Sequence, residues 1–203
     1  MNVNIPKLKK GYIEISLVGD TSLLTNRFSE KAKQTMLDVQ EKKAKQGRAK
    51  RVPWNDYVES MYWLSDKPKK VTEKDIEEAT FGFPAIGFKA SAVRAANDAG
   101  MKMTEARRMF HVDSEFVVIE TPNGPRMNED TVRIGMGKTD LRFRGEFVDW
   151  TATFVISYNA GVISMEQVVN LFEIAGFGVG VGEHRPERNG INGRFHVAKE
   201  NEA

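Results

Sequence analysis

The chain has 203 residues, of which 40% are hydrophobic and 29% charged, with a formal net charge of +2. This length and balance fit one domain that can bury its own core. The absence of cysteine excludes disulfides, thiolate metal sites and cysteine nucleophiles, and agrees with a reducing cytoplasm. MNVNIPKLKK lacks the apolar core of a signal peptide, and no run of 18 apolar residues occurs. We therefore expect a cytoplasmic protein without a membrane partner.

The first predicted elements are a strand and a helix. GYIEISLV alternates apolar with small or polar residues, which predicts a strand over about 11–18. A helix is predicted over about 28–46, after Thr25 or Asn26 as N-cap, because Met36 and Val39 continue an apolar spacing of three and four. The segment 31–51 is the most basic of the chain. Its candidate phosphate contacts are Lys42, Lys43, Lys45, Arg48, Lys50 and Arg51.

The middle of the chain is predicted to be mainly helical. A short helix should follow Pro53 in WNDYVESMYWL, and the polar stretch 65–79 carries no pattern that could fill a core. A further helix is predicted from about residue 85 to a C-cap at Gly100, and another within 101–112.

From residue 115 the apolar pattern changes to a period of two. This predicts antiparallel strands in EFVVIE, TVRIG, LRFRGEFV and TATFVISYN, with a hairpin loop at Asn123-Gly124 between the first two. SMEQVVNLFEIAG is the clearest helix, with a capping box of Ser164 and Gln167 and with Gly176 as its stop. GRFHVAKE should form the last strand.

The predicted order is strand, helices, antiparallel strands, helix, glycine-rich loop and final strand. It is typical of an α+β fold of the ferredoxin-like or RNA-recognition-like type, in which helices cover one face of an antiparallel sheet. We expect one domain over 1–203, with a helical, partly polar insertion at about 47–112.

Six glycines lie within residues 176–193. Glycine permits positive φ and close backbone approach, so such a loop can wrap a phosphate or lie against a nucleotide, or can equally form a tight packed turn. GFGVGVGE lacks the Lys-Ser or Lys-Thr of a P-loop and the surrounding unit of a dinucleotide site, which argues against nucleotide hydrolysis.

Arginines accompany these glycines. Arg185 and Arg188 lie in the loop and Arg194 follows it, while Arg142 and Arg144 share one face of a predicted strand. With the segment 31–51 they carry enough positive charge to track a phosphate backbone. Four aromatic residues could stack on bases: Phe110, Phe143, Phe147 and Trp150. Aromatic residues at strand spacing usually belong to the core, however.

The chain has three histidines, His111, His184 and His196. Only His184 adjoins the glycine loop, where it is a candidate general base for RNA cleavage. A solvated or hydrogen-bonded side chain is the more common role of such a histidine, and the sequence indicates no second base. The histidines are too far apart for a metal site. We predict no catalytic residue, no metal and no cofactor.

The segment GFGVGVGEHRPERNGINGRFHV resembles the glycine-rich signature of the RAMP superfamily, which includes backbone and processing subunits of CRISPR effector complexes. ISLVGDTSLLTNRFSEKAKQTM, FGFPAIGFKASAVRAA and RGEFVDWTATFVISYNAGVISMEQVVNLFEIAGFGVGVGEHRPERNG together resemble a family of phage and prophage proteins. The RAMP resemblance implies an RNA-recognition-like core that binds single-stranded RNA or DNA, in some members as a filament. It assigns the binding roles to Gly178, Gly180, Gly182, Gly190, Gly193, Arg185, Arg188 and Arg194.

The leading expectation is a non-enzymatic, phage-type RAMP-like protein that binds single-stranded DNA or RNA without strong sequence preference and self-associates, with a filament as one form of assembly. One alternative is a structural or protein-interaction module, such as an anti-defence protein, in which the glycines only shape a turn. A second alternative is an RNA endonuclease that uses His184. The phage-like resemblance implies the cytoplasm of the host cell.

Overall fold

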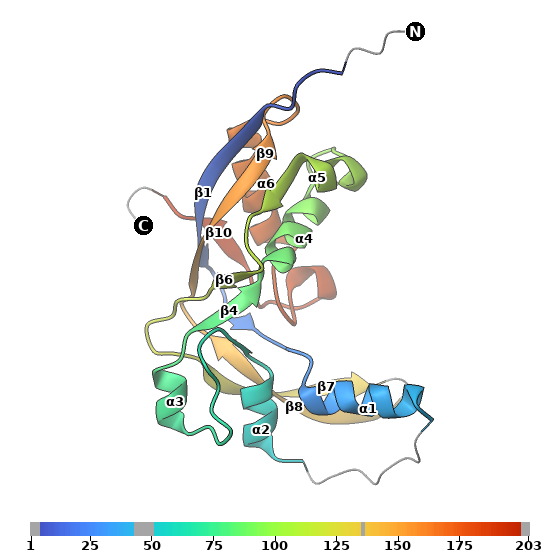
Figure 1. Ribbon diagram of the computed structural model, residues 1–203, viewed down its shortest axis with the longest axis vertical. Coiled ribbons are helices and arrows are strands. Elements are labelled where there is room, and N and C mark those ends of the chain that lie inside the picture. The colour runs from blue at the N-terminus through green and yellow to red at the C-terminus, as the bar shows by residue number, and fades with distance from the viewer. Residues whose placement is uncertain (1–4, 43–50, 135–136, 200–203) are drawn as a thin grey trace.

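The structure, a computed structural model, describes residues 5–42, 51–134 and 137–199. The described chain mixes helices with three antiparallel sheets in an elongated molecule (Figure 1). The largest sheet occupies one half of the length, and a long hairpin with shorter helices occupies the other half. No helix within these ranges is long and apolar enough to cross a membrane.

The largest sheet has the strand order β10-β1-β9-β5. Strand β1 (Lys10–Gly19) pairs along most of its length with β9 (Thr151–Asn159), and the short strands β10 (Phe195–Val197) and β5 (Phe110–Val112) form the edges. Burial alternates along β1, where Ile15 and Leu17 face the core. The alternation that predicted the first strand therefore reflects a sheet covered on one face.

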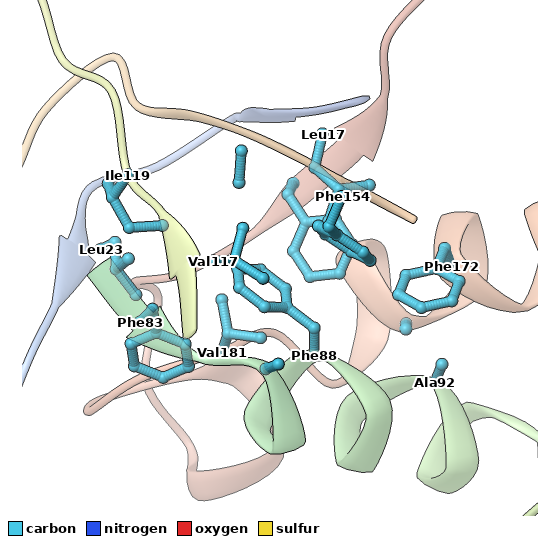
Figure 2. Packing of buried hydrophobic residues seen from close by; sticks show 14 of the residues in the cluster. Leu17, Leu23, Phe83, Phe88, Ala92, Val117, Ile119, Phe154, Phe172 and Val181 are labelled. Carbon is cyan, nitrogen blue, oxygen red and sulfur yellow. The ribbon is translucent and has the colours of Figure 1, made fainter. Parts of the chain in front are cut away.

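Helices α4 (Ala85–Ala95) and α6 (Met165–Gly178) cover this sheet, and α5 (Met103–Met109) leads from α4 into β5 (Figure 1). Phe88 of α4, Phe154 of β9 and Phe172 of α6 meet in the core between them (Figure 2). Their ring centroids lie 5.2 Å apart for Phe88 and Phe154 and 5.8 Å apart for Phe154 and Phe172. These aromatic contacts join both helices to the central strands.

Helix α6 begins as predicted but ends later. Ser164 and Gln167 form the expected capping box. The predicted stop at Gly176 is wrong, because the helix continues to Gly178. A Cβ at Gly176 would overlap the backbone carbonyl of Phe195 in β10. This glycine permits close packing of helix against strand rather than ending the helix.

Two smaller sheets complete the fold. Strands β7 (Arg126–Ile134) and β8 (Lys138–Phe147) form a long hairpin, and β2 (Leu23–Leu24) pairs with the other edge of β8. The third sheet has the order β3-β4-β6, with β3 at Tyr62–Trp63, β4 at Phe81–Pro84 and β6 at Phe116–Val118. The hairpin predicted at Asn123-Gly124 is wrong, because β6 pairs with β4 and β7 pairs with β8.

The region predicted as a helical insertion contains α2 (Pro53–Glu59) and α3 (Glu73–Glu77), but also strands β3 and β4. The polar stretch 65–79 was expected to add nothing to the core, but it does contribute to it. Thr72 and Asp75 form a capping box at the start of α3, and this helix buries Ile76. A single apolar side chain in a polar helix was too weak a pattern to predict this contact.

Helix α1 (Glu30–Gln40) is shorter than predicted, and its N-cap is Ser29 rather than Thr25 or Asn26. The Ser29 hydroxyl accepts a hydrogen bond from the Ala32 amide at 3.2 Å. Thr25, which follows β2, is instead buried, and its hydroxyl donates to the Gly145 carbonyl of β8 at 3.4 Å. The apolar face of this helix is not buried, because Met36 and Val39 are exposed.

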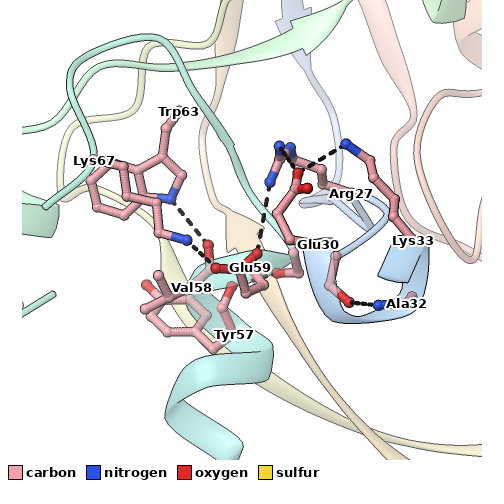
Figure 3. Close-up of polar contacts among 11 residues, drawn as sticks. Arg27, Glu30, Ala32, Lys33, Tyr57, Val58, Glu59, Trp63 and Lys67 are labelled. Carbon is pink, nitrogen blue, oxygen red and sulfur yellow. Dashed lines mark hydrogen bonds and ion pairs between the residues drawn. The ribbon is translucent and has the colours of Figure 1, made fainter. Parts of the chain in front are cut away.

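Ion pairs connect the start of α1 to α2 (Figure 3). Arg27 lies 3.1 Å from a Glu30 carboxylate oxygen and 3.8 Å from one of Glu59 in α2, which Lys67 also contacts. The Trp63 indole donates to the Val58 carbonyl at 3.0 Å (Figure 3). This end of α1 is therefore attached to the body of the protein.

Candidate nucleic-acid interface

The glycine loop connects α6 to β10 and is held by backbone hydrogen bonds. Val181 donates to the Gly193 carbonyl at 2.9 Å, and Glu183 donates to the Leu24 carbonyl of β2 at 2.9 Å. Gly193 in turn donates to the Ser22 carbonyl at 2.8 Å. The loop is therefore fixed to the N-terminal part of the chain.

Packing and backbone geometry explain most of the loop glycines. Gly180, Gly182 and Gly193 have φ of +71°, +75° and +67°, which disfavours any other residue. A Cβ at Gly182 would overlap the Leu24 carbonyl, and one at Gly193 would overlap the Val181 carbonyl. Gly190 is equally confined, against the backbone of His184. Gly178 differs, because the nearest atom to its Cβ position, from Asp98, is 3.9 Å away.

A cavity of about 250 Å³ lies beside this turn. One wall is the loop backbone over 179–182, and another is a face of α4. Gly87 of α4 leaves room for the Phe83 ring, which would lie 2.5 Å from a Cβ at that position. The side chains that bring polar or aromatic groups to the cavity are Asn26, Tyr62, Phe83, Ser91, Arg94, Glu183, Arg185 and Glu187.

Two guanidinium groups converge on one carboxylate in this cavity. Arg185 donates from Nε and Nη2 to Glu187 at 3.0 and 2.8 Å, and Arg94 of α4 binds the same carboxylate. Arg185 also donates to the Gly182 carbonyl at 3.0 Å. The trio therefore carries one net positive charge and holds the loop against α4.

Glu183 and Tyr62 also line the cavity. Glu183 accepts a hydrogen bond from the Asn26 amide at 3.3 Å, and its other carboxylate oxygen lies 4.0 Å from Arg144 Nη2. The Tyr62 ring packs against Phe83 and Phe116 at centroid distances of 6.1 and 5.8 Å. Burial raises the pKa of the Tyr62 hydroxyl, the charge of Arg27 lowers it and that of Glu183 raises it further. The hydroxyl therefore stays protonated at neutral pH.

The candidate arginines of β8 are paired with acids. Arg144 is only 6% exposed, and its Nη1 lies 2.9 Å from Asp130. It is therefore a buried ion-pair partner and not a phosphate contact, which corrects the prediction. Arg142 Nε lies 3.1 Å from Asp140, and Arg51 Nη1 lies 2.7 Å from the same carboxylate.

The other candidate cations differ in exposure. Arg188 ends a single 3-10 turn, Pro186–Arg188, and is exposed. The half-buried Arg194 guanidinium lies 5.5 Å from the centroid of the Phe177 ring, and Lys42 is exposed after α1. The remaining candidates lie outside the described residues: Lys43, Lys45, Arg48 and Lys50.

The aromatic residues expected to stack on bases are mostly core. Phe110, Phe147 and Trp150 are completely buried, and Phe143 is partly buried. The cavity instead contains Tyr62, which sequence reasoning assigned to a short apolar helix face. Nothing local in the sequence relates this residue to a loop some 120 positions later.

His184 lies next to a charge cluster that sequence reasoning could not place. Its φ is +53°, and its ring Nε2 is 3.3 Å from Arg144 Nη1 and 3.8 Å from Asp130. His111 contacts Lys89, and His196 contacts Asp20. In the part of the chain that the structure describes, no group of three or more histidine and carboxylate side chains is arranged to hold a metal ion.

The sequence matches no known protein-family model. No curated protein shows significant similarity to it.

Proposed function

We propose that the protein binds single-stranded DNA or RNA at the cavity beside the glycine loop, without enzymatic activity and in the cytoplasm of a host cell. The observation that carries this proposal is the cavity itself, where Tyr62 adjoins the loop backbone and the guanidinium groups of Arg94 and Arg185. Aromatic rings beside positive charge are the usual means of holding a single strand, since bases stack and phosphates are neutralised.

We infer that the four-stranded sheet and its helices form a ferredoxin-like, RNA-recognition-like unit of the RAMP type. The chain order supports this inference: β1, α4, β5, β9, α6 and β10 occur in the order βαββαβ, with other elements inserted between them, and the sheet order is β10-β1-β9-β5. The glycine loop precedes the last strand of this unit, as in the resemblance to the RAMP signature.

Arg188 and Arg194 are the phosphate contacts of this proposal. Arg188 is exposed on the loop, and Arg194 follows the last loop glycine. Arg185 contributes less to phosphate binding, because its guanidinium group is already paired with the Glu187 carboxylate through two hydrogen bonds. The buried Arg144 positions the loop through Asp130 and Glu183 rather than touching a strand.

The test is fluorescence anisotropy of labelled single-stranded DNA and RNA at two salt concentrations. Each phosphate contact contributes about −0.7 to the slope of log K against log salt for single strands. We expect Arg188→Ala with Arg194→Ala to weaken binding and to make the slope shallower by about 1.4. Arg107→Ala with Arg108→Ala, on exposed positions of α5, removes the same charge elsewhere and should change the slope less.

Wild-type protein that binds neither strand would contradict the proposal and favour the second candidate, a protein-interaction module. Two exposed apolar side chains support that candidate: Phe177 is 74% exposed and Ile191 is 76% exposed. They adjoin the glycine loop and also suit the self-association that the sequence led us to expect, because large exposed apolar groups mark contact surfaces. The oligonucleotides should remain intact after incubation, whereas cleavage that His184→Ala abolishes would favour an endonuclease.

A further inference from the structure

We propose that the cavity beside the glycine loop takes one unpaired base of the bound strand and prefers guanine, which Glu183 recognises. This inference rests on the proposed binding of single strands at the same cavity. Its volume of about 250 Å³ lies below the roughly 300–1,000 Å³ of pockets that enclose drug-sized molecules. A single planar base is therefore a better match than a larger ligand.

Tyr62 offers the stacking surface. Its ring is partly buried against Phe83 and Phe116, which fix its orientation, and it lines the cavity. Single-stranded nucleic acids are commonly recognised by a base that is unstacked, placed on an aromatic side chain and read along its Watson–Crick edge. The ring alone accepts any base, so selection requires a polar group at the edge.

Glu183 supplies that polar group. A carboxylate can only accept hydrogen bonds, and the Glu183 side chain is 41% exposed at the cavity wall. Guanine presents two adjacent donors on its Watson–Crick edge, N1–H and the N2 amino group, which match two carboxylate oxygens. Adenine presents one donor beside one acceptor, cytosine one donor beside two acceptors, and thymine or uracil one donor between two acceptors. The two acceptor oxygens of Glu183 therefore favour guanine.

The orientation of Glu183 is set by its neighbours. The Asn26 amide donates to one carboxylate oxygen at 3.3 Å, and Arg144 lies 4.0 Å from the other. The backbone amide of Glu183 is bound to Leu24, so the loop cannot turn this residue away without losing a hydrogen bond. The paired Arg94 and Arg185 border the same cavity, where a guanidinium can donate to the acceptors of guanine.

The test compares thymine oligonucleotides that carry one central guanine, inosine, adenine or cytosine. Inosine keeps N1–H and lacks only the N2 amino group. We expect the guanine probe to bind about tenfold or more tightly than the thymine control, because a good bidentate contact discriminates by this much. The inosine probe should lose most of this gain in affinity over the thymine control, because it lacks the second donor.

Glu183→Gln should equalise the affinities for these probes, because the neutral amide no longer offers two acceptor oxygens. Glu77→Gln, on an exposed position of α3, makes the same charge change away from the cavity and should retain guanine preference. Tyr62→Leu should weaken binding of every probe. A free guanosine monophosphate that binds as tightly as the guanine strand would overturn the proposal in favour of a nucleotide site.

Equal, salt-sensitive binding of all probes by the wild type would overturn the guanine preference and leave single-strand binding intact. Retention of the preference in Glu183→Gln would also overturn the inference, since another group would then read the base. No binding of any probe would reject the proposed function first and this inference with it.

Discussion

Gly193 shows how one residue of the glycine loop combines two constraints. Its φ is +67°, and a Cβ would overlap the Val181 carbonyl. We expect Gly193→Ala to lower the free energy of unfolding by at least about 2 kcal/mol, because left-handed strain and a backbone clash add. Urea denaturation of wild type and variant measures this loss.

Gly100 is the matched control for Gly193. Its φ is +72°, but nothing lies within 4 Å of a Cβ there. Gly100→Ala should therefore cost only the backbone strain, about 1 kcal/mol. Equal losses in the two variants would mean that close packing of the glycine turn contributes nothing to stability.

At the scale of the element, α6 depends on its buried face. Leu171 of α6 is buried in the core, and we expect Leu171→Ala to cost about 2–5 kcal/mol through the cavity it leaves. Asn170→Ala, on the exposed face of the same helix, should change stability by less than about 0.5 kcal/mol. Chemical denaturation followed by far-UV circular dichroism measures both, and a loss below about 1 kcal/mol for Leu171→Ala would contradict its burial.

At the scale of the whole molecule, one apolar cluster joins the three sheets. Phe81 of β4 contacts Phe147 of β8 at a centroid distance of 5.8 Å, and Phe88 of α4 contacts Trp150 at 6.3 Å. We therefore expect the sheets to unfold together. A variant with Trp54→Phe and Trp63→Phe leaves Trp150 as the only tryptophan, and its fluorescence and far-UV circular dichroism should give the same urea midpoint.

Separate midpoints in this variant would show that the large sheet and the hairpin half unfold independently. The exposed outer part of α1 is not expected to influence either midpoint, because Met36 and Val39 lie outside the core. Met36→Ala provides the control, with a change within about 0.5 kcal/mol.

Strand alternation and helix caps made much of the secondary structure predictable. β1 and β9 show the alternation of a sheet with one buried face, and the capping box of Ser164 and Gln167 defines the start of α6. The stop at Gly176 was wrong because a glycine inside a helix and a glycine at its end look alike in sequence. The close approach of the Phe195 backbone in β10 explains why position 176 is glycine.

The sequence by itself determined the α+β composition, the antiparallel strands and a glycine-rich loop before the last strand, because periodicity, caps and glycine content are local properties. The tertiary structure decided which strands pair, so that β6 joins β4 and not β7. It also decided that Arg144 is buried beside Asp130, and that Asn26, Tyr62 and Glu183 share one cavity. Pairing, burial and convergence depend on packing between segments far apart in the chain, for which no local pattern exists.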